Sequence, residues 1–182
     1  MEYIKFDPLQ LRILAYVGIS MVLGAVIGID REFADKPAGL RTHMLVAGAA
    51  TLLVDLSDVI VSHFYTHVDP EILTANPVRI MQAVITGVSF LGAGTIIRRS
   101  STQIEGLTTA ASILFATAIG IAVALSQLVL AIGATLIVLV TLRVVGGLEI
   151  WILQKKEGRQ LAHPKESFVN GTTSDKDEKP SD

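Results

Sequence analysis

The sequence has 182 residues, of which 51% are hydrophobic, 18% are charged and only 5% are aromatic. Ordinary soluble domains carry roughly 25% charged residues, and disordered chains contain far fewer apolar residues. The absence of cysteine excludes disulfide scaffolds and thiolate chemistry, and a net charge of −2 gives no footprint for nucleic acid. The apolar residues are mostly aliphatic or small, which is typical of helices packed in lipid.

Five apolar stretches approach the length of about 20 residues that a membrane-spanning helix needs. In chain order they cover residues 11–29, 42–62, 78–97, 107–125 and 128–152. The first runs directly into Asp30, Arg31 and Glu32, so we expect a retained span rather than a signal peptide. The shortest connection, Ser126-Gln127, separates the fourth stretch from the fifth. We therefore predict an all-α bundle of about five transmembrane helices in residues 1–154, followed by a disordered polar tail at 155–182.

Basic residues of the short loops indicate the orientation of a membrane protein, because Lys and Arg favour the cytosolic side. Arg31, Lys36 and Arg41 follow the first stretch, and Arg98 and Arg99 follow the third. With five spans these loops and the basic start of the tail share one side. We expect the N-terminus outside and the C-terminus in the cytosol.

Small residues at a spacing of four mark the first stretch, where Gly24 and Gly28 form a GxxxG pattern. Such a pattern lets two helix backbones approach closely, either within the chain or across a dimer. We expect a homodimer, because five helices rich in small residues leave few ways to bury these glycines within one chain.

A second group of glycines, Gly87, Gly92 and Gly94, closes the third stretch. Each glycine costs a helix about 1 kcal/mol relative to alanine. In lipid this is tolerated where a neighbouring helix packs tightly, or where the helix breaks around a site. If the helix breaks, its freed carbonyl groups would line a polar pocket.

The segment between the first two stretches holds six charges from Asp30 to Arg41. One interpretation is a set of interfacial flanks that follow the positive-inside rule. The other is a buried network in which Arg31, Arg41 and the acids form ion pairs that close this face. Thr108 and Thr109 open the fourth stretch, where a hydroxyl group caps a helix start or bonds back to its carbonyl groups.

Asp55 and Asp58 interrupt the second stretch and lie on one helix face, since they are three residues apart. An acid within a membrane span is a candidate functional residue. The pair is suited to a hydrated Mg²⁺ ion, which usually takes one or two carboxylates, or to a shared proton. Alternatively, the span ends early and both acids lie in water.

Two ordered motifs resemble the signatures of the MgtC/SapB family of bacterial inner-membrane proteins. The first is GAVIGIDRE at 24–32 followed by PAGLRTH at 37–43; the second is FLGAGTI at 90–96 followed by GLTTAA at 106–111. The resemblance covers roughly residues 11–147. It implies a polar network at matching positions, namely Asp30, Arg31, Glu32, Arg41, Thr42, Thr108 and Thr109.

The resemblance also implies a multi-pass protein linked to growth at low Mg²⁺, acid tolerance and survival in host cells. Some members of the family modulate other membrane machines, including the proton-translocating ATP synthase. Two positions depart from the family pattern: Asp30 replaces the usual Glu, and Thr108 replaces an Asn, which favours the short SapB-like branch. Only the polar tail follows residue 152, where longer members carry a soluble domain.

Two main functions follow from these patterns, and neither is enzymatic. The first is a regulator of Mg²⁺ homeostasis and of acid or low-Mg²⁺ stress, which contacts itself or another membrane complex such as ATP synthase or a transporter. The alternative is a Mg²⁺ or proton transporter, with Asp55 and Asp58 at its outer mouth, the glycine-broken helix at its site and Arg31 with Arg41 as its inner gate. A weaker third hypothesis is lipid or anion binding by the cytosolic arginines. Mg²⁺ is the only ligand that the sequence suggests as a cofactor.

Overall fold

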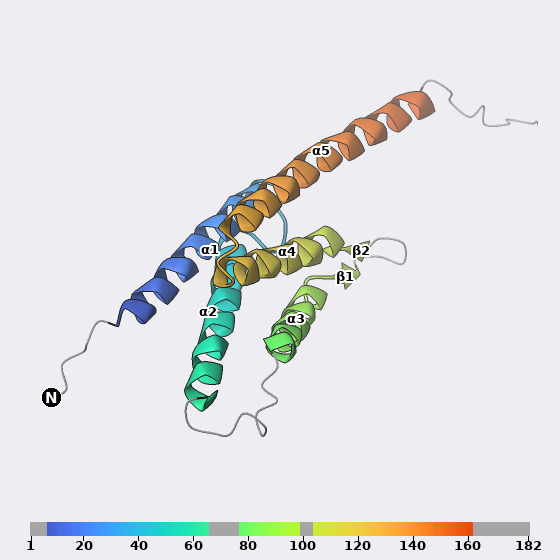
Figure 1. Cartoon of the computed structure of the whole chain (residues 1–182). Helices are drawn as coiled ribbons and strands as arrows, with labels where there is room; N and C mark the ends of the chain where they lie inside the picture. Colours follow the sequence, from blue (N-terminus) through green and yellow to red (C-terminus); the bar gives the residue numbers. More distant parts are fainter. Residues whose placement is uncertain (1–6, 66–76, 99–103, 162–182) are drawn as a thin grey trace, which may run out of the picture. The chain divides into compact units, whose positions relative to one another are not determined.

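The computed structural model describes residues 7–65, 77–98 and 104–161, and within them it is almost entirely helical (Figure 1). The elements in chain order are α1 (Pro8–Phe33), α2 (Leu40–Tyr65), α3 (Pro77–Ala93), β1 (Ile97–Arg98), β2 (Ile104–Glu105), α4 (Leu107–Ala124) and α5 (Leu128–Leu161). The two short strands pair antiparallel and join α3 to α4. In the described part of the chain, α1, α2, α4 and α5 each hold an apolar segment long enough to cross a membrane. The all-α, membrane-type fold is therefore confirmed.

Helix α3 is shorter than the sequence predicts, because it ends at Ala93 instead of reaching residue 97. The backbone N–H and the hydroxyl group of Thr95 both donate to the carbonyl oxygen of Gly92, at 2.9 and 2.7 Å, which closes the last turn. The helix is unbroken up to that point, so the expected break at the glycines is instead the helix end. Gly92 packs against Ala110 of α4, Gly87 is exposed, and Gly94 lies in the turn that follows.

The expected turn between the fourth and fifth stretches is confirmed, and its geometry explains how it is so short. Ser126 adopts a left-handed conformation with φ of 61°. Its N–H donates to the carbonyl oxygen of Val123 at 2.9 Å, and that of Gln127 donates to Ala122 at 2.8 Å. This pair of bonds ends a helix and satisfies its last carbonyl groups. Asp35, with φ of 53°, ends α1 in the same way.

Close backbone contacts hold α1, α2 and α4 against one another. A Cβ atom added to Gly24 would lie 2.5 Å from the carbonyl oxygen of His43 on α2. Gly28 faces Leu40 at the start of the same helix, and Gly120 of α4 faces Ala47. Both glycines of the GxxxG pattern are thus buried within a single chain. The structure removes the reason that the sequence offered for a homodimer, since α2 covers these residues.

The chain divides into two compact units, residues 1–143 and 144–182. In the first unit, buried residues of α5 such as Ala131 and Val138 join an apolar cluster with Ile27 of α1 and Ile119 of α4. In the second unit, α5 continues as a helix to Leu161. Residues 155–161 are therefore helical, which corrects the prediction that disorder begins at 155. The rest of the predicted tail, 162–182, lies outside the described residues.

Candidate functional site

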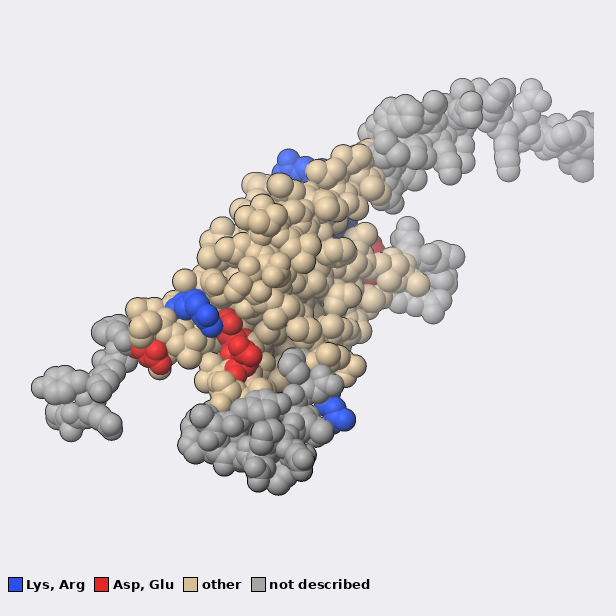
Figure 2. Space-filling model, viewed as in Figure 1, with Lys and Arg blue, Asp and Glu red and all other residues tan. Residues whose placement is uncertain are grey.

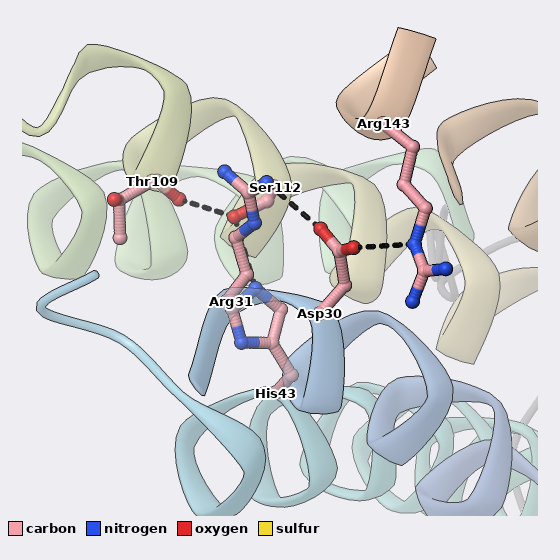
Figure 3. A network of polar contacts seen from close by, with 6 residues as sticks. All are labelled: Asp30, Arg31, His43, Thr109, Ser112 and Arg143. Atoms are coloured by element: carbon pink, nitrogen blue, oxygen red, sulfur yellow. Dashed lines mark hydrogen bonds and ion pairs between the residues drawn. The ribbon is translucent and has the colours of Figure 1, made fainter. Parts of the chain in front are cut away.

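An ion-pair network lies at the end of α1 that meets the start of α2 (Figure 3). Asp30 of α1 accepts from the Nη2 group of Arg31 at 2.9 Å and from the Nε group of Arg143, on α5, also at 2.9 Å. The side chains of Asp30 and Arg31 are only 11% and 7% exposed, whereas that of Arg143 is 71% exposed. One half-buried carboxylate thus accepts hydrogen bonds from two guanidinium groups, so these three side chains carry a net charge of +1. The Nε atom of Arg31 is buried without a hydrogen-bond partner.

His43 of α2 is fully buried beside this network, near enough for the charge of Arg31 to act on it (Figure 3). Its Nδ1 atom donates to the carbonyl oxygen of Gly39 at 2.9 Å, since a carbonyl group can only accept. Its Nε2 atom lies 2.9 Å from the hydroxyl oxygen of Ser112 on α4. These two bonds tie the start of α2 to the first turns of α4.

The hydroxyl group of Ser112 has two acceptors within reach but a single proton to give. It lies 2.8 Å from the carbonyl oxygen of Thr109 as well as 2.9 Å from His43. If Ser112 donates to His43, the imidazole is neutral; if Ser112 donates to Thr109, His43 must donate to Ser112 and is an imidazolium. The protonation of His43 and the direction of the Ser112 hydroxyl group are therefore coupled.

Glu32 belongs to the site in a structural role. Its Oε2 atom accepts from the backbone N–H of Leu40 at 3.0 Å, which satisfies one of the free N–H groups at the start of α2. Arg41, by contrast, is exposed and pairs with no acid in the part of the chain that the structure describes, so it takes no part in the expected gate. Thr42 is half-buried and Thr108 is exposed. Of the residues named from the resemblance, the structure gathers Asp30, Arg31, Glu32 and Thr109 at this end.

Sequence reasoning missed Arg143 and His43 as members of this network. Arg143 is the first charged residue of α5 and follows 15 uncharged residues from Leu128, and a charge within a long apolar stretch indicates a buried or functional partner. His43 ends the first family motif, but a histidine so close to Arg41 reads equally well as part of a wet loop. Only the tertiary contact with Ser112 distinguishes these alternatives.

Two buried threonines allow a matched test of the hydrogen bonds in the core. The hydroxyl group of Thr51 lies within bonding distance of the carbonyl oxygens of Gly120, at 2.8 Å, and Ala47, at 3.1 Å. The hydroxyl oxygen of Thr109 is buried without a partner. We expect Thr51→Val to lower the free energy of unfolding by about 1 kcal/mol, while Thr109→Val is neutral or stabilising. Thermal unfolding in detergent, followed by circular dichroism, measures both, and equal losses would contradict this assignment.

A second polar site lies at the opposite ends of these helices, in a cavity of about 300 Å³. Asp55 is 7% exposed and its Oδ2 atom has no partner, whereas Asp58 is exposed; both line the cavity together with Arg12 of α1. Figure 2 shows basic and acidic side chains meeting at one place on this face, while other charged side chains lie singly toward its edges. Helix α2 continues past Asp55 and Asp58 to Tyr65. The alternative prediction, in which this helix ends before the two acids, therefore does not hold for the helix itself. Among the described residues, no three acidic, histidine or cysteine side chains gather as a metal site.

Comparisons with known proteins identify relatives of this chain. The chain is 32% identical over 165 residues to Protein SapB of Bacillus subtilis, covering 91% of this chain and 68% of that protein. It is 34% identical over 159 residues to the putative magnesium transporter YhiD of Escherichia coli K12, covering 85% and 70%. It is 37% identical over 138 residues to Protein MgtC of Salmonella typhimurium, covering 76% and 52%. No solved structure matches the chain.

The family pattern described as the MgtC family matches residues 17–151, which include the Asp30 network, the two carboxylates of the second site and all of α1–α4 except the first turns of α1, where Arg12 lies. This match covers most of the chain, and the relatives above exceed 30% identity along most of its length. The chain therefore belongs to the MgtC family.

Proposed function

We propose that this protein is a multi-pass protein of the bacterial inner membrane that serves Mg²⁺ homeostasis and acid or low-Mg²⁺ stress without enzymatic activity. It acts through contacts with itself or with another membrane complex, such as a transporter or ATP synthase. The link to Mg²⁺ rests on family membership and on a relative named as a putative magnesium transporter. The choice of a regulator rests on the packing between the two polar sites.

That packing is the observation that carries the proposal. Between the Asp55 cavity and the Asp30 network, α1, α2 and α4 meet through Gly24, Ala47 and Gly120. Each glycine lies so close to the backbone of α2 that a Cβ atom would not fit. Ala47 is fully buried, and so are Ile113 and Ala116 next to it in one apolar cluster. An ion moving between the two sites through this contact would have to separate three closely packed helices. A monomer built this way favours a fixed scaffold over a conduit.

We further propose five spans, with the N-terminus outside. Helix α3 has 17 residues and is about 26 Å long, close to the ~30 Å of a bilayer core. Near its start, Ile80 and Met81 line the cavity together with Ala124, the last residue of α4, while Gly92 near its end packs on Ala110 of α4. It therefore extends along most of α4, which is long enough to span. The basic residues Arg31, Lys36 and Arg41 then lie on the cytosolic side.

The alternative is a Mg²⁺ or proton transporter, and the Asp55 cavity is the observation that favours it. A buried, unpartnered carboxylate beside an exposed one would suit a cation entering from outside. The inner parts of that pathway are missing, however. Helix α3 is unbroken to Ala93, and Arg41 is exposed, so the residues that the structure describes do not supply the expected broken helix or inner gate.

Flux through the purified protein in liposomes separates the two functions. The vesicles contain a dye sensitive to Mg²⁺ or to pH. We expect Mg²⁺ and protons to enter vesicles with the protein no faster than vesicles without it. As a control, an ionophore should dissipate the ion gradient in both kinds of vesicle. Protein-dependent flux would overturn the regulator proposal if Asp55→Asn abolishes it and Asp35→Asn does not. Asp35 is a matched control because it is exposed at the other end and its left-handed conformation also suits asparagine.

A further inference from the structure

The cavity at the Asp55 end carries both signs of charge. Asp55 and Asp58 of α2 supply two carboxylates, and Arg12 of α1 supplies one guanidinium group. Ser126, in the turn between α4 and α5, adds a hydroxyl group, and Leu125 is one of several apolar residues in the wall. The described lining residues thus have a net charge of −1 in a cavity of about 300 Å³ that is open to the surface.

Asp55 is the residue that needs a ligand. It is 7% exposed, it lines the cavity, and its Oδ2 atom is buried without a hydrogen-bond donor. The charge of Arg12 acts on Asp55 through space, but a buried carboxylate oxygen without a hydrogen-bond donor is still costly. Asp58, one turn further along α2, is exposed at the same cavity and shares its face. A positively charged group that donates hydrogen bonds would reach both carboxylates.

Arg12 stands beside the cavity with its guanidinium group available. It lies over the ring of Tyr16, 6.0 Å from the ring centre, and forms no ion pair with Asp55 or Asp58. The hydroxyl group of Tyr16 is in turn hydrogen-bonded to Ser126 at 3.2 Å, which ties this wall of the cavity together. Arg12 acts on Asp55 only through space, so its N–H groups remain available to an anionic group.

The depth of the cavity suits a lipid head group. Arg12 lies four residues after Pro8, the first residue of α1, which is about 6 Å along the helix axis. Arginine near the end of a spanning helix places its charge at the membrane interface. Asp55 lines the same cavity as Arg12 and lies seven residues, about 10 Å, before Ser62, where the apolar segment of α2 ends.

We propose that this cavity binds a phosphate joined to a primary ammonium group, in the form of the phosphatidylethanolamine head group. The ammonium group donates to Asp55 and Asp58, and the phosphate accepts from Arg12. This arrangement provides the missing donor for Asp55 and gives every charge a partner of opposite sign. A lone divalent cation would satisfy the carboxylates but leave Arg12 facing a charge of its own sign. The proposal is independent of the regulator function, because it concerns occupancy of the site and not transport.

Native mass spectrometry of the full-length protein in detergent tests this inference. The probes are phosphatidylethanolamine, phosphatidylcholine and phosphatidylglycerol with identical acyl chains, at equal concentrations. Phosphatidylcholine keeps the phosphate but has no N–H donor. We expect the phosphatidylethanolamine adduct to be favoured over it about tenfold, the effect of one charge-assisted hydrogen bond. Equal adducts of the two lipids would overturn the proposal.

Three variants assign the roles of the side chains. Asp55→Asn should reduce the phosphatidylethanolamine adduct to the level of the phosphatidylcholine adduct. The matched control Asp35→Asn should leave the preference for phosphatidylethanolamine unchanged. Arg12→Gln should weaken both lipids alike, because both contain the phosphate group. If Asp55→Asn does not fold, Asp58→Asn replaces it, since Asp58 is exposed and its loss should lower the same preference. An unchanged preference in Asp58→Asn or Asp55→Asn would contradict the assignment.

Two competitors identify the source of the ligand. Free O-phosphoethanolamine carries the same two charged groups without acyl chains. If it displaces the lipid at an equal concentration, the site serves a soluble compound of this chemistry; if it does not, the lipid is the occupant. Millimolar MgCl₂ should leave the adduct in place, and displacement by MgCl₂ in the unmodified protein but not in Asp55→Asn would replace the proposal with a divalent-cation site.

Discussion

Replacing Gly24 by alanine is expected to lower the free energy of unfolding by about 2 kcal/mol, a typical cost of overpacking a closely packed interior. The added Cβ atom would meet the backbone carbonyl oxygen of His43 at 2.5 Å and the Cβ atom of Ala47 at 3.0 Å. A carbonyl group within a helix cannot move aside like a flexible side chain. The two helices must separate instead, which also strains the His43–Ser112 bond nearby.

Gly18→Ala is the matched control, because it makes the same change on the same helix. A Cβ atom at Gly18 would meet nothing within 4 Å. Alanine has the higher helix propensity, so this variant should be neutral or stabilising by up to about 1 kcal/mol. Thermal unfolding of both variants in one detergent, followed by circular dichroism, provides the comparison. Similar losses in the two variants would show that the α1–α2 contact tolerates extra volume.

The helices themselves could be predicted from the sequence because apolar length is a local property. The turn at Ser126-Gln127 was equally predictable, since an interruption of two polar residues between apolar stretches is visible without tertiary information. The end of α3 was not, because Gly92 and Gly94 are compatible both with tight packing and with a broken helix. Whether the helix packs tightly at Gly92 depends on Ala110, which is remote in sequence and contacts Gly92 only in the folded chain.

The candidate site was predictable in its chemistry but not in its membership. For the six charges between two apolar stretches, an ion-pair network was one of two interpretations, and Asp30 with Arg31 do form an ion pair. The choice between Arg41 and Arg143 as the second arginine depends on helix rotation. In α2 the side chain of Arg41 is exposed, while α5 brings Arg143, 113 positions after Asp30, to the carboxylate. Periodicity within one helix carries no information about that meeting.

Removing the charge of Asp30 is expected to have the largest effect of any single substitution at this site. In Asp30→Asn the guanidinium group of Arg31 remains buried, with its side chain 7% exposed, and loses its only anionic partner in the described structure. Breaking a buried pair in this way typically costs about 3–5 kcal/mol, because one charge is left uncompensated. By contrast, Arg143→Gln should cost less than about 1 kcal/mol, since that side chain is 71% exposed and its pair is screened by water.

A double-mutant cycle then distinguishes a stabilising ion pair from the cost of an orphaned charge. Arg31→Met replaces the guanidinium group by an unbranched apolar side chain and leaves Asp30 paired with Arg143. The free energy of unfolding of this variant should therefore fall only slightly. If the penalty in Asp30→Asn arises from the unpaired guanidinium group, Asp30→Asn combined with Arg31→Met should recover most of it, because apolar replacement of a buried pair is often near neutral. The unfolding free energies of the two singles and the double, measured in the same mixed micelles, give the coupling. A double variant that loses the sum of both singles would show that the two side chains act independently, and that the network holds α1 and α5 through Arg143 instead.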